Sequence, residues 1–238
     1  MSLSIGKLFR LTTFGESHGP AIGGILEGCP AGLKLDLKYV QNSLDLRKPG
    51  TSFLSSQRRE HDVVQFLSGV FNGVTLGTPI GFLIKNKDAK SSDYNNLKDV
   101  YRPSHADFTY EKKYGIRDHR GGGRSSARET ANWVVAGSIA SQILSIKGIS
   151  IHSYVSSVGN ISVDLDYKEL DLDTIYSNEV RCPSQKVANK MINIIQECQK
   201  TGDTVGGKVF CVVKNLPIGL GDPVFGKLQA DIARAVMS

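Results

Sequence analysis

Apolar and polar residues alternate over short stretches in the first third of the chain, a pattern typical of β-strands. The alternation predicts a strand over residues 8–14, and a short apolar run predicts another over residues 21–26, followed by the turn-forming sequence Gly-Cys-Pro-Ala-Gly at residues 28–32. Two further strands are predicted over residues 63–70 and 74–85. The sequence Phe71-Asn72-Gly73 between them predicts a tight hairpin, because Asn and Gly both tolerate positive φ.

Helical spacing of apolar residues predicts a helix that Asp36 caps and that ends near Arg47. The clearest helix is predicted from a capping box at residues 126–129, in which Ser126 and Glu129 would satisfy free backbone amides. This helix would run to about Gly148. Another helix is expected between a Ser184 cap and residue 202, and the pattern of residues 225–238 is also helical. Strands are predicted over residues 149–158 and 208–213.

Residues 86–123 are mostly polar and irregular in pattern, with a short helix predicted over residues 106–114. A connection of this length inside a domain is usually functional or disordered. Charged and histidine residues concentrate here, which favours function. No repeat or interdomain linker is visible, so the sequence predicts one α+β domain over residues 1–238. Because the last helical pattern stops without a cap, we expect this domain to be incomplete at its C-terminal end.

The net charge of +6 is unevenly distributed. Basic residues gather at Arg47–Lys48, at Arg58–Arg59 and across Arg102–Arg128, which favours a site for a polyanionic ligand over a uniform basic coat. The four cysteines show no C-x-x-C spacing, so we expect reduced thiols and no metal site. Without an apolar leader at the N-terminus or an apolar run of about 20 residues, we expect a cytoplasmic protein.

A run of three glycines at residues 121–123 leads into the predicted long helix. A helix N-terminus offers free amides to an anion, and Arg124 and Arg128 add charge with a geometry suited to phosphate or carboxylate. The sequence lacks the G-K-[ST] of a P-loop. The alternative is a flexible loop before an ordinary helix, and we favour anion binding.

Two histidines have settings that suit proton transfer. His18 lies in Gly-Glu-Ser-His-Gly (residues 15–19) after the first predicted strand, and His105 lies in Arg-Pro-Ser-His-Ala-Asp (residues 102–107). From spacing alone a structural role is the commoner reading for His18, and the two readings are equally balanced for His105. The remaining three histidines, His61, His119 and His152, are expected to be structural or on the surface.

Several segments, in order, resemble the chorismate synthase family. The sequences G-E-S-H-G-P-A-I-G-G-I-L-E-G-C-P-A-G (15–32) and G-G-G-R-S-S-A-R-E-T-A-N-W-V-V-A-G-S-I-A (121–140) are similar to the two family signatures. Between them, R-K-P-G-T-S, Q-R-R-E, L-S-G-V-F-N-G, D-V-Y-R-P-S-H-A-D and K-Y-G-I-R-D-H-R match further blocks, and G-D-T-V-G-G and L-P-I-G-L-G-D-P-V-F follow. The resemblance covers nearly the whole chain.

The resemblance implies a β–α–β sandwich with helices between two antiparallel sheets, and a homotetramer. It implies a 1,4-elimination of phosphate from 5-enolpyruvylshikimate 3-phosphate, giving chorismate in aromatic amino-acid biosynthesis. The substrate is a small polyanion. Reduced FMN is required without net redox change, assisting phosphate loss and receiving the ring hydrogen. With no reductase segment visible, an external flavin reductant would be needed, with NADPH as indirect reductant.

The resemblance also implies roles for individual residues. His18 and His105 would be the acid–base residues, one near the flavin and one near the leaving phosphate. The residues expected to meet the substrate are Ser17, Arg47, Arg102 and Arg128. The residues expected to line FMN are Arg124, Ser125, Ser126 and Ala127, and Arg47 would also contact NADPH.

Two departures from the family pattern stand out. A second arginine associated with NADPH is replaced by Phe53. Family members also continue past the equivalent of Ser238, through an R-x-D-P segment that supplies a catalytic aspartate, so we expect the chain to hold part of the site. Two other interpretations are a flavin- or anion-binding fragment without turnover and, from the charge, a nucleic-acid-binding protein, although the sequence carries no recognisable nucleic-acid motif.

Overall fold

The computed structural model describes residues 3–48, 62–87, 94 and 96–238. By their internal contacts these residues form two compact units, the first ending at Ile143 and the second beginning at Leu144. The fold is of the α+β class, with helices and antiparallel sheets in separate stretches of chain. The organisation of residues 1–238 as one domain stays a prediction.

An antiparallel sheet with the strand order β1-β2-β3-β7-β4 organises the first unit. Its strands are β1 (Ser4–Ile5), β2 (Arg10–Gly15), β3 (Ala21–Glu27), β7 (Ile80–Lys85) and β4 (Val64–Phe66). The sheet confirms the strands predicted over residues 8–14 and 21–26. A two-stranded ribbon of β5 (Val70–Phe71) and β6 (Val74–Thr75) extends from it.

The predicted hairpin is right in its turn and wrong in the length of its strands. Asn72 and Gly73 have φ values of 48° and 76°, as a tight turn requires, but β5 and β6 are only two residues long. The chain bends at Gly69, where φ is 78°, and Pro79 precedes β7. Between these bends the chain leaves the main sheet, and β4 and β7 then pair with each other in it.

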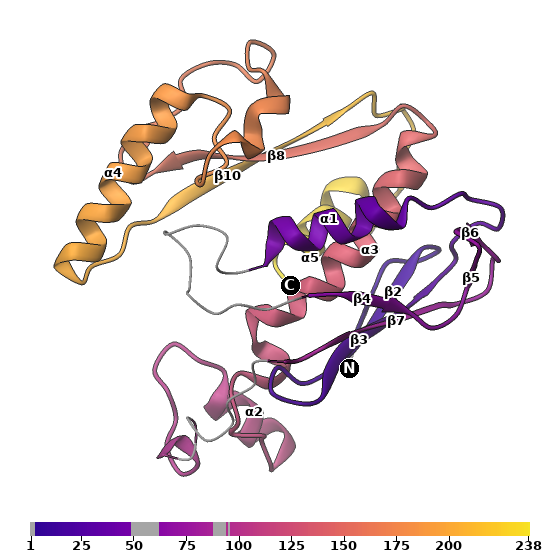
Figure 1. Ribbon diagram of the computed structural model, residues 1–238, viewed down its shortest axis with the longest axis horizontal. Coiled ribbons are helices and arrows are strands. Elements are labelled where there is room, and N and C mark those ends of the chain that lie inside the picture. Colours follow the sequence, from indigo (N-terminus) through magenta and orange to yellow (C-terminus); the bar gives the residue numbers. More distant parts are fainter. Residues whose placement is uncertain (1–2, 49–61, 88–93, 95) are drawn as a thin grey trace. The chain divides into compact units, whose positions relative to one another are not determined.

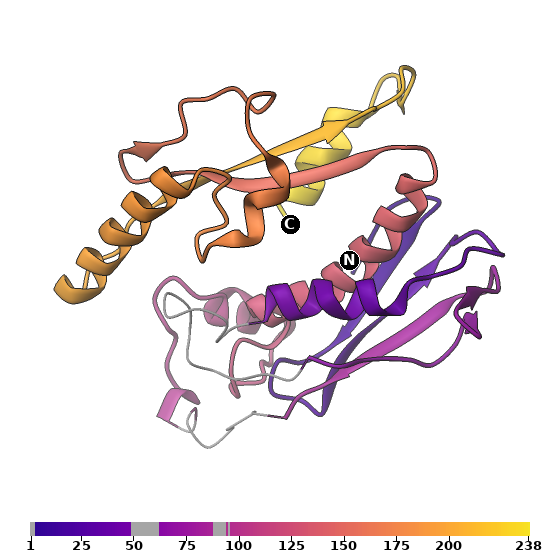
Figure 2. The same cartoon turned by 45° about the horizontal axis from the view of Figure 1, so that its top comes forward.

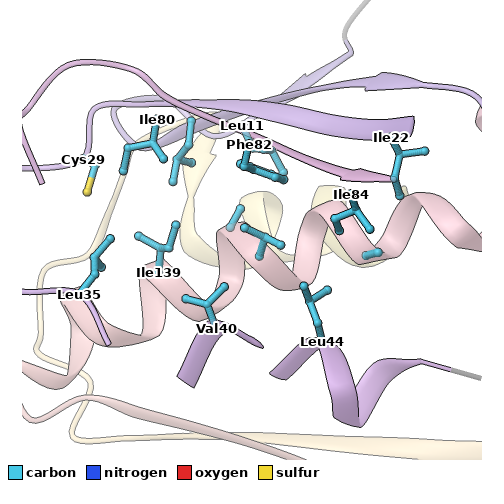
Figure 3. Close-up of a cluster of buried hydrophobic side chains, with 14 residues drawn as sticks. Leu11, Ile22, Cys29, Leu35, Val40, Leu44, Ile80, Phe82, Ile84 and Ile139 are labelled. Carbon is cyan, nitrogen blue, oxygen red and sulfur yellow. The ribbon is translucent and has the colours of Figure 1, made fainter. Parts of the chain in front are cut away.

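Two helices cover one face of this sheet in Figures 1 and 2: α1 (Leu37–Arg47) and α3 (Thr130–Ser145). Asp36 caps α1 as predicted, accepting a hydrogen bond of 2.9 Å from the Tyr39 amide. Strand and helix side chains meet in one apolar cluster, shown in Figure 3. The labelled members of this cluster are Leu11, Ile22, Cys29, Leu35, Val40, Leu44, Ile80, Phe82, Ile84 and Ile139.

The start of α3 differs from the predicted capping box. Ser126 does cap, accepting from the Arg128 amide at 3.3 Å, but it does so at a short 3₁₀ turn, η3 (Ala127–Glu129). The Glu129 carboxylate accepts hydrogen bonds from the Arg124 guanidinium instead of completing the box. An ion pair competes successfully for this carboxylate because a charged donor makes a stronger bond than a backbone amide. The helix ends at Ser145, slightly earlier than expected.

The second unit is built on a long antiparallel pair, β8 (Ser150–Val158) and β10 (Gly207–Lys214), with β9 (Ile161–Ser162) beside β8 (Figure 2). Helix α4 (Gln185–Thr201) packs against β8 and β9. Ser184 is the N-cap residue of α4 as predicted, although its side chain makes no capping hydrogen bond. The remaining elements are η4 (Leu172–Ser177), β11 (Gly221–Asp222), β12 (Gly226–Lys227) and α5 (Leu228–Val236).

The four cysteines are not joined in disulfides, and Cys29 and Cys182 are buried in the cores of the first and second units. Burial raises the pKa of both thiols, which makes them less reactive. In the described part of the chain, no helix is both long and apolar enough to cross a membrane.

Candidate active site

The loop of Gly121, Gly122 and Gly123 is the meeting point of the predicted catalytic residues. A Cβ atom added at Gly121 would lie 2.1 Å from Nδ1 of His18, and one added at Gly122 would lie 3.2 Å from Nε2 of His105. The loop therefore has His18 and His105 as direct neighbours, although they come from different parts of the sequence. The absence of side chains at these two positions lets both imidazoles approach the backbone.

His18 lies in the turn between β2 and β3. Its Nδ1 is 3.2 Å from the hydroxyl of Ser17, which is almost completely buried. On another side, the edge of the Tyr94 ring meets the imidazole with a centroid distance of 4.7 Å. Tyr94 carried no signal in the sequence, because a lone aromatic residue in a polar segment predicts no contact. Ser17, Tyr94 and Gly121 are thus all in contact with the imidazole.

His105 precedes the short helix α2 (Asp107–Tyr114), whose existence confirms the prediction for residues 106–114. Its Nδ1 lies 3.0 Å from a carboxylate oxygen of the buried Asp107. The same carboxylate accepts two hydrogen bonds of 2.8 Å from the Arg102 guanidinium. Arg102 also donates to the Gly121 carbonyl at 3.0 Å. Arg102 and His105 are thus held together against the glycine loop, and Asp107 is a residue to which the sequence assigned no role.

Hydrogen bonds from Arg102 hold the pKa of Asp107 far below its ordinary value of 3.8, against the opposing effect of burial. A lowered carboxyl pKa stabilises the folded protein above about pH 4, and this contribution is lost progressively as the pH falls further. We therefore expect Asp107→Asn to lower the urea midpoint at pH 7, with a difference from the unchanged protein that shrinks between pH 4 and pH 3. A difference in urea midpoint that stays constant from pH 4 to pH 3 would contradict the lowered pKa of Asp107.

Arg124 fastens the glycine loop to the protein interior. Its guanidinium donates to both Glu129 carboxylate oxygens, at 2.7 and 3.0 Å. It also reaches the Thr13 hydroxyl at 2.6 Å and the Gly15 carbonyl at 2.9 Å, both on β2. These bonds direct the Arg124 side chain toward β2 and Glu129, so its charge stabilises the position of the glycine loop. The sequence suggested Arg124 as an anion ligand because it follows the glycine run at a predicted helix N-terminus, whereas the structure pairs its guanidinium with Glu129.

Arg47 and Arg128 share one buried carboxylate. Asp62 accepts a hydrogen bond of 2.9 Å from Arg128 and lies 3.5 Å from the Arg47 guanidinium. Arg47, at the end of α1, also donates to the Thr130 hydroxyl at 3.1 Å and to the Ala127 carbonyl at 2.6 Å. The predicted substrate residues Arg47 and Arg128 therefore come together. Asp62 gave no sequence signal, since it stands alone beside a charged stretch.

The basic stretch from Arg102 to Arg128 is extensively compensated by acidic residues. Each of its five arginines has a carboxylate oxygen within 3.0 Å. The pairs are Arg102–Asp107, Arg117–Glu111, Arg120–Asp118, Arg124–Glu129 and Arg128–Asp62. The arginines of this stretch are therefore paired with carboxylates.

A cavity of about 330 Å³ lies beside the glycine loop. Its wall is formed by the loop and by α2 with the residues after it. The lining residues are Leu3, Glu16, Ala106, Asp107, Tyr110, Tyr114, Ile116, Arg117, Asp118, Gly121, Gly122, Gly123, Arg124 and Ser125. Burial raises the pKa of Glu16, while the charge of Arg124 partly opposes this shift. Two predicted FMN residues, Arg124 and Ser125, thus border a space whose walls combine tyrosine and apolar side chains with charged ones.

The other two predicted FMN residues lie where the loop enters α3. The Ser126 hydroxyl is bonded to the Arg128 amide, and the Ala127 carbonyl accepts from Arg47. Among the described residues there is no cluster of three or more side chains able to hold a metal ion. Phe53, Arg58, Arg59 and His61 lie outside the described residues.

These features define an α+β protein with a paired-histidine site on a glycine loop. The family model for chorismate synthase matches residues 9–238. Proteins called chorismate synthase from Christiangramia forsetii and Flavobacterium psychrophilum are 60% and 58% identical to the chain over 235 residues. The chain therefore belongs to the chorismate synthase family.

A solved structure supports the same relation. The structure titled "Crystal Structure of Chorismate Synthase" has a TM-score of 0.78 and 30% sequence identity to this chain. It is matched over 97% of this chain and 65% of its own length. The two curated relatives are likewise matched over 99% of this chain and 66% of their own length. The chain thus spans slightly less than two thirds of its relatives.

Proposed function

We propose that the protein catalyses the chorismate synthase reaction, the 1,4-elimination of phosphate from 5-enolpyruvylshikimate 3-phosphate to give chorismate. The observation that carries this proposal is the meeting of His18 and His105 on one glycine loop, in a chain that belongs to the family. The elimination breaks a carbon–oxygen bond to phosphate and a ring carbon–hydrogen bond, and one new double bond forms. Two groups able to hold or move protons at neutral pH suit this chemistry.

The proposed roles follow the positions of the residues. Arg102 lies beside His105 and would face the departing phosphate with its charge partly compensated by Asp107, while His105 would donate a proton there. His18, beside Ser17 and Tyr94, would hold a proton on the flavin side. Arg47 and Arg128 would balance the anionic groups of the substrate. Because Asp62 neutralises one of these two charges, the pair would offer one net positive charge.

The described residues fit reduced FMN through their shape and backbone. The cavity beside Gly121–Ser125 has tyrosine and apolar walls suited to a planar ring. Arg124 would act indirectly, by holding the loop, since its guanidinium is bonded to Glu129, Thr13 and Gly15. Ser125, Ser126 and Ala127 would contribute the edge of the loop. When bound, the reduced flavin would supply electron density that assists phosphate loss and would receive the ring hydrogen.

The rest of the proposal rests on family membership alone. It comprises the sandwich of helices between two antiparallel sheets, a homotetramer, an external flavin reductant and a cytoplasmic location. NADPH would serve as indirect reductant, and its contact with Arg47 stays a prediction. A second candidate function is flavin or anion binding without turnover, which the cavity alone would also support.

The test is anaerobic phosphate release from 5-enolpyruvylshikimate 3-phosphate with chemically reduced FMN, and with oxidised FMN as a control. We expect release only with reduced flavin, and a decrease of about 10²- to 10⁴-fold in His18→Ala and His105→Ala, since each removes a proton-transfer group. His152→Ala is the matched control, because this histidine lies on β8 beside Ser150 in the second unit. A folded protein that binds FMN without releasing phosphate would establish the second candidate instead.

A further inference from the structure

Asn86, the residue after β7, makes hydrogen bonds to two separate parts of the first unit, the turn between β2 and β3 and the side chain of Arg128. Its side-chain amide donates to the Glu16 carbonyl at 3.0 Å and to the Gly19 carbonyl at 2.8 Å. Its backbone amide donates to the Pro20 carbonyl at 3.1 Å. Its side-chain oxygen accepts from Nε of Arg128. The side-chain orientation is determined by these partners, because carbonyls only accept and a guanidinium only donates.

The two carbonyls that Asn86 binds stand on either side of Ser17 and His18. The turn is itself closed by a hydrogen bond of 3.0 Å from the Gly19 amide to the Glu16 carbonyl. Asn86 therefore ties both ends of the turn to the end of β7, which lies between β3 and β4 in the sheet. Movement of this turn would move the His18 imidazole relative to Gly121, where the packing leaves no room for a methyl group.

Arg128 continues the connection on the other side of Asn86. Its Nε bonds to Asn86 and its terminal nitrogen to Asp62, so that the guanidinium is held from two directions. A continuous path of hydrogen bonds thus runs from Asp62 through Arg128 and Asn86 to the turn that carries His18. Residue 128 belongs to the predicted anion site and residue 18 to the predicted proton-transfer site.

We propose that Asn86 is a positioning residue that fixes the Ser17–His18 turn against the glycine loop and joins it to Arg128. Its catalytic importance rests on the proposed function, whereas its effect on the position of His18 does not. A displacement of about 1 Å in a reacting group can reduce turnover about a hundredfold. Asn86 therefore acts on the reaction through His18, without touching the substrate.

Two substitutions distinguish the hydrogen bonds from Asn86 to the turn from the hydrogen bond between Asn86 and Arg128. Asn86→Asp keeps an oxygen for Arg128 but replaces the amide that donates to the Glu16 and Gly19 carbonyls. Asn86→Ala removes both links and introduces no charge, so it keeps the test decisive if the aspartate variant does not fold. The matched control is Asn178→Asp in the second unit, where the Asn178 side chain bonds to the Cys182 backbone carbonyl and amide at 2.8 and 3.1 Å.

The measurements are the imidazole NMR signals of His18 and His105, the Arg128 Nε–H signal, and turnover. We expect both Asn86 variants to shift the His18 signals and leave those of His105 in place, because Arg102 and Asp107 hold His105. The Arg128 Nε–H signal should change in both variants, but only in Asn86→Ala should Nε–H lose its hydrogen-bond acceptor and exchange faster with water. In Asn86→Ala, which introduces no charge beside Arg128, kcat should fall at least about tenfold while KM changes less than about threefold. The control should change none of these readouts.

Unchanged His18 signals in folded variants of Asn86 would overturn the proposal, as would equal shifts for both histidines. If the unchanged protein releases no phosphate but the His18 signals respond as expected, the proposed function fails and the positioning role stands. If phosphate is released and turnover in Asn86→Ala equals that of the unchanged protein, the positioning role in catalysis is overturned while the proposed function stands.

Discussion

Replacement of Gly121 by alanine is expected to displace His18 and to lower phosphate release by at least about a hundredfold. The new Cβ would lie 2.1 Å from Nδ1 of His18, far closer than a van der Waals contact. The imidazole would also be within 2.4 Å of it at Cε1, so no small rotation of the ring relieves the overlap. Because Ser17 and Tyr94 confine the ring from other directions, His18 must leave its position or the loop must move.

Gly115→Ala is the matched control for this experiment. Gly121 and Gly115 have φ values of +83° and +75°, so both substitutions carry a similar backbone cost of about 1–2 kcal/mol. A Cβ at Gly115, however, would meet no atom within 4 Å. The difference between the two variants therefore measures the contact between Gly121 and His18, separated from the backbone conformation.

The readouts are phosphate release, the free energy of unfolding in urea and the His18 imidazole NMR signals. We expect similar losses of stability from backbone strain, with an additional loss and shifted His18 signals only in Gly121→Ala. Equal phosphate release in the two alanine variants would show that catalysis does not depend on the contact between His18 and Gly121. It would contradict the assignment of the active site to the glycine loop.

Asp62→Ala is expected to lower the free energy of unfolding by about 3–5 kcal/mol, the range found when one partner of a buried ion pair is removed. The Asp62 side chain is completely buried, and that of Arg128 is 4% exposed. Without this carboxylate, Arg128 loses an ionic hydrogen bond of 2.9 Å in a place that water reaches poorly. Arg47 loses its contact at the same time, so the ends of α1 and η3 are expected to loosen together.

Asp45→Asn provides the comparison for Asp62→Ala. Asp45 pairs with Lys48 at 2.9 Å on the exposed side of α1, where the aspartate side chain is 44% exposed. Solvent-exposed pairs of this kind contribute about 0–1 kcal/mol. Urea unfolding of the three proteins at pH 7 gives both differences. A loss below about 1 kcal/mol in Asp62→Ala would mean that Arg128 finds another compensating partner after the change.

The sheet and helices of the first unit were largely predictable from the sequence because local signals and burial agree there. The Asp36 cap, the spacing of Val40 and Leu44, and the Asn72-Gly73 turn each act over a few residues. The errors arose where a distant partner decided the outcome. Glu129 completes no capping box because Arg124 takes its carboxylate, and β4 pairs with β7 because bends at Gly69 and before Pro79 redirect the chain.

The candidate site was predictable in its main residues and not in their supporting partners. His18, His105 and the glycine run were visible as motifs, and the structure brings them together. Asp62 and Asn86 were not visible, because a single buried carboxylate or amide has no periodic pattern and no fixed spacing from the arginine it holds. Such residues can be found only when the chain's three-dimensional path is known.

The ion pairs between arginines and carboxylates around the glycine loop restrict which substitutions this site can accept during evolution. Among the described residues the apolar cluster of the first unit takes no member from residues 86–128, and ion pairs together with aromatic contacts such as that of Tyr101 with Phe108 hold this region. An apolar core tolerates a change of one residue at a time, whereas a partly buried ion pair penalises the loss of either member alone. Substitutions here are therefore expected to accumulate as coupled pairs in descendants of this sequence, and the site should change far more slowly than the helices that cover the sheet.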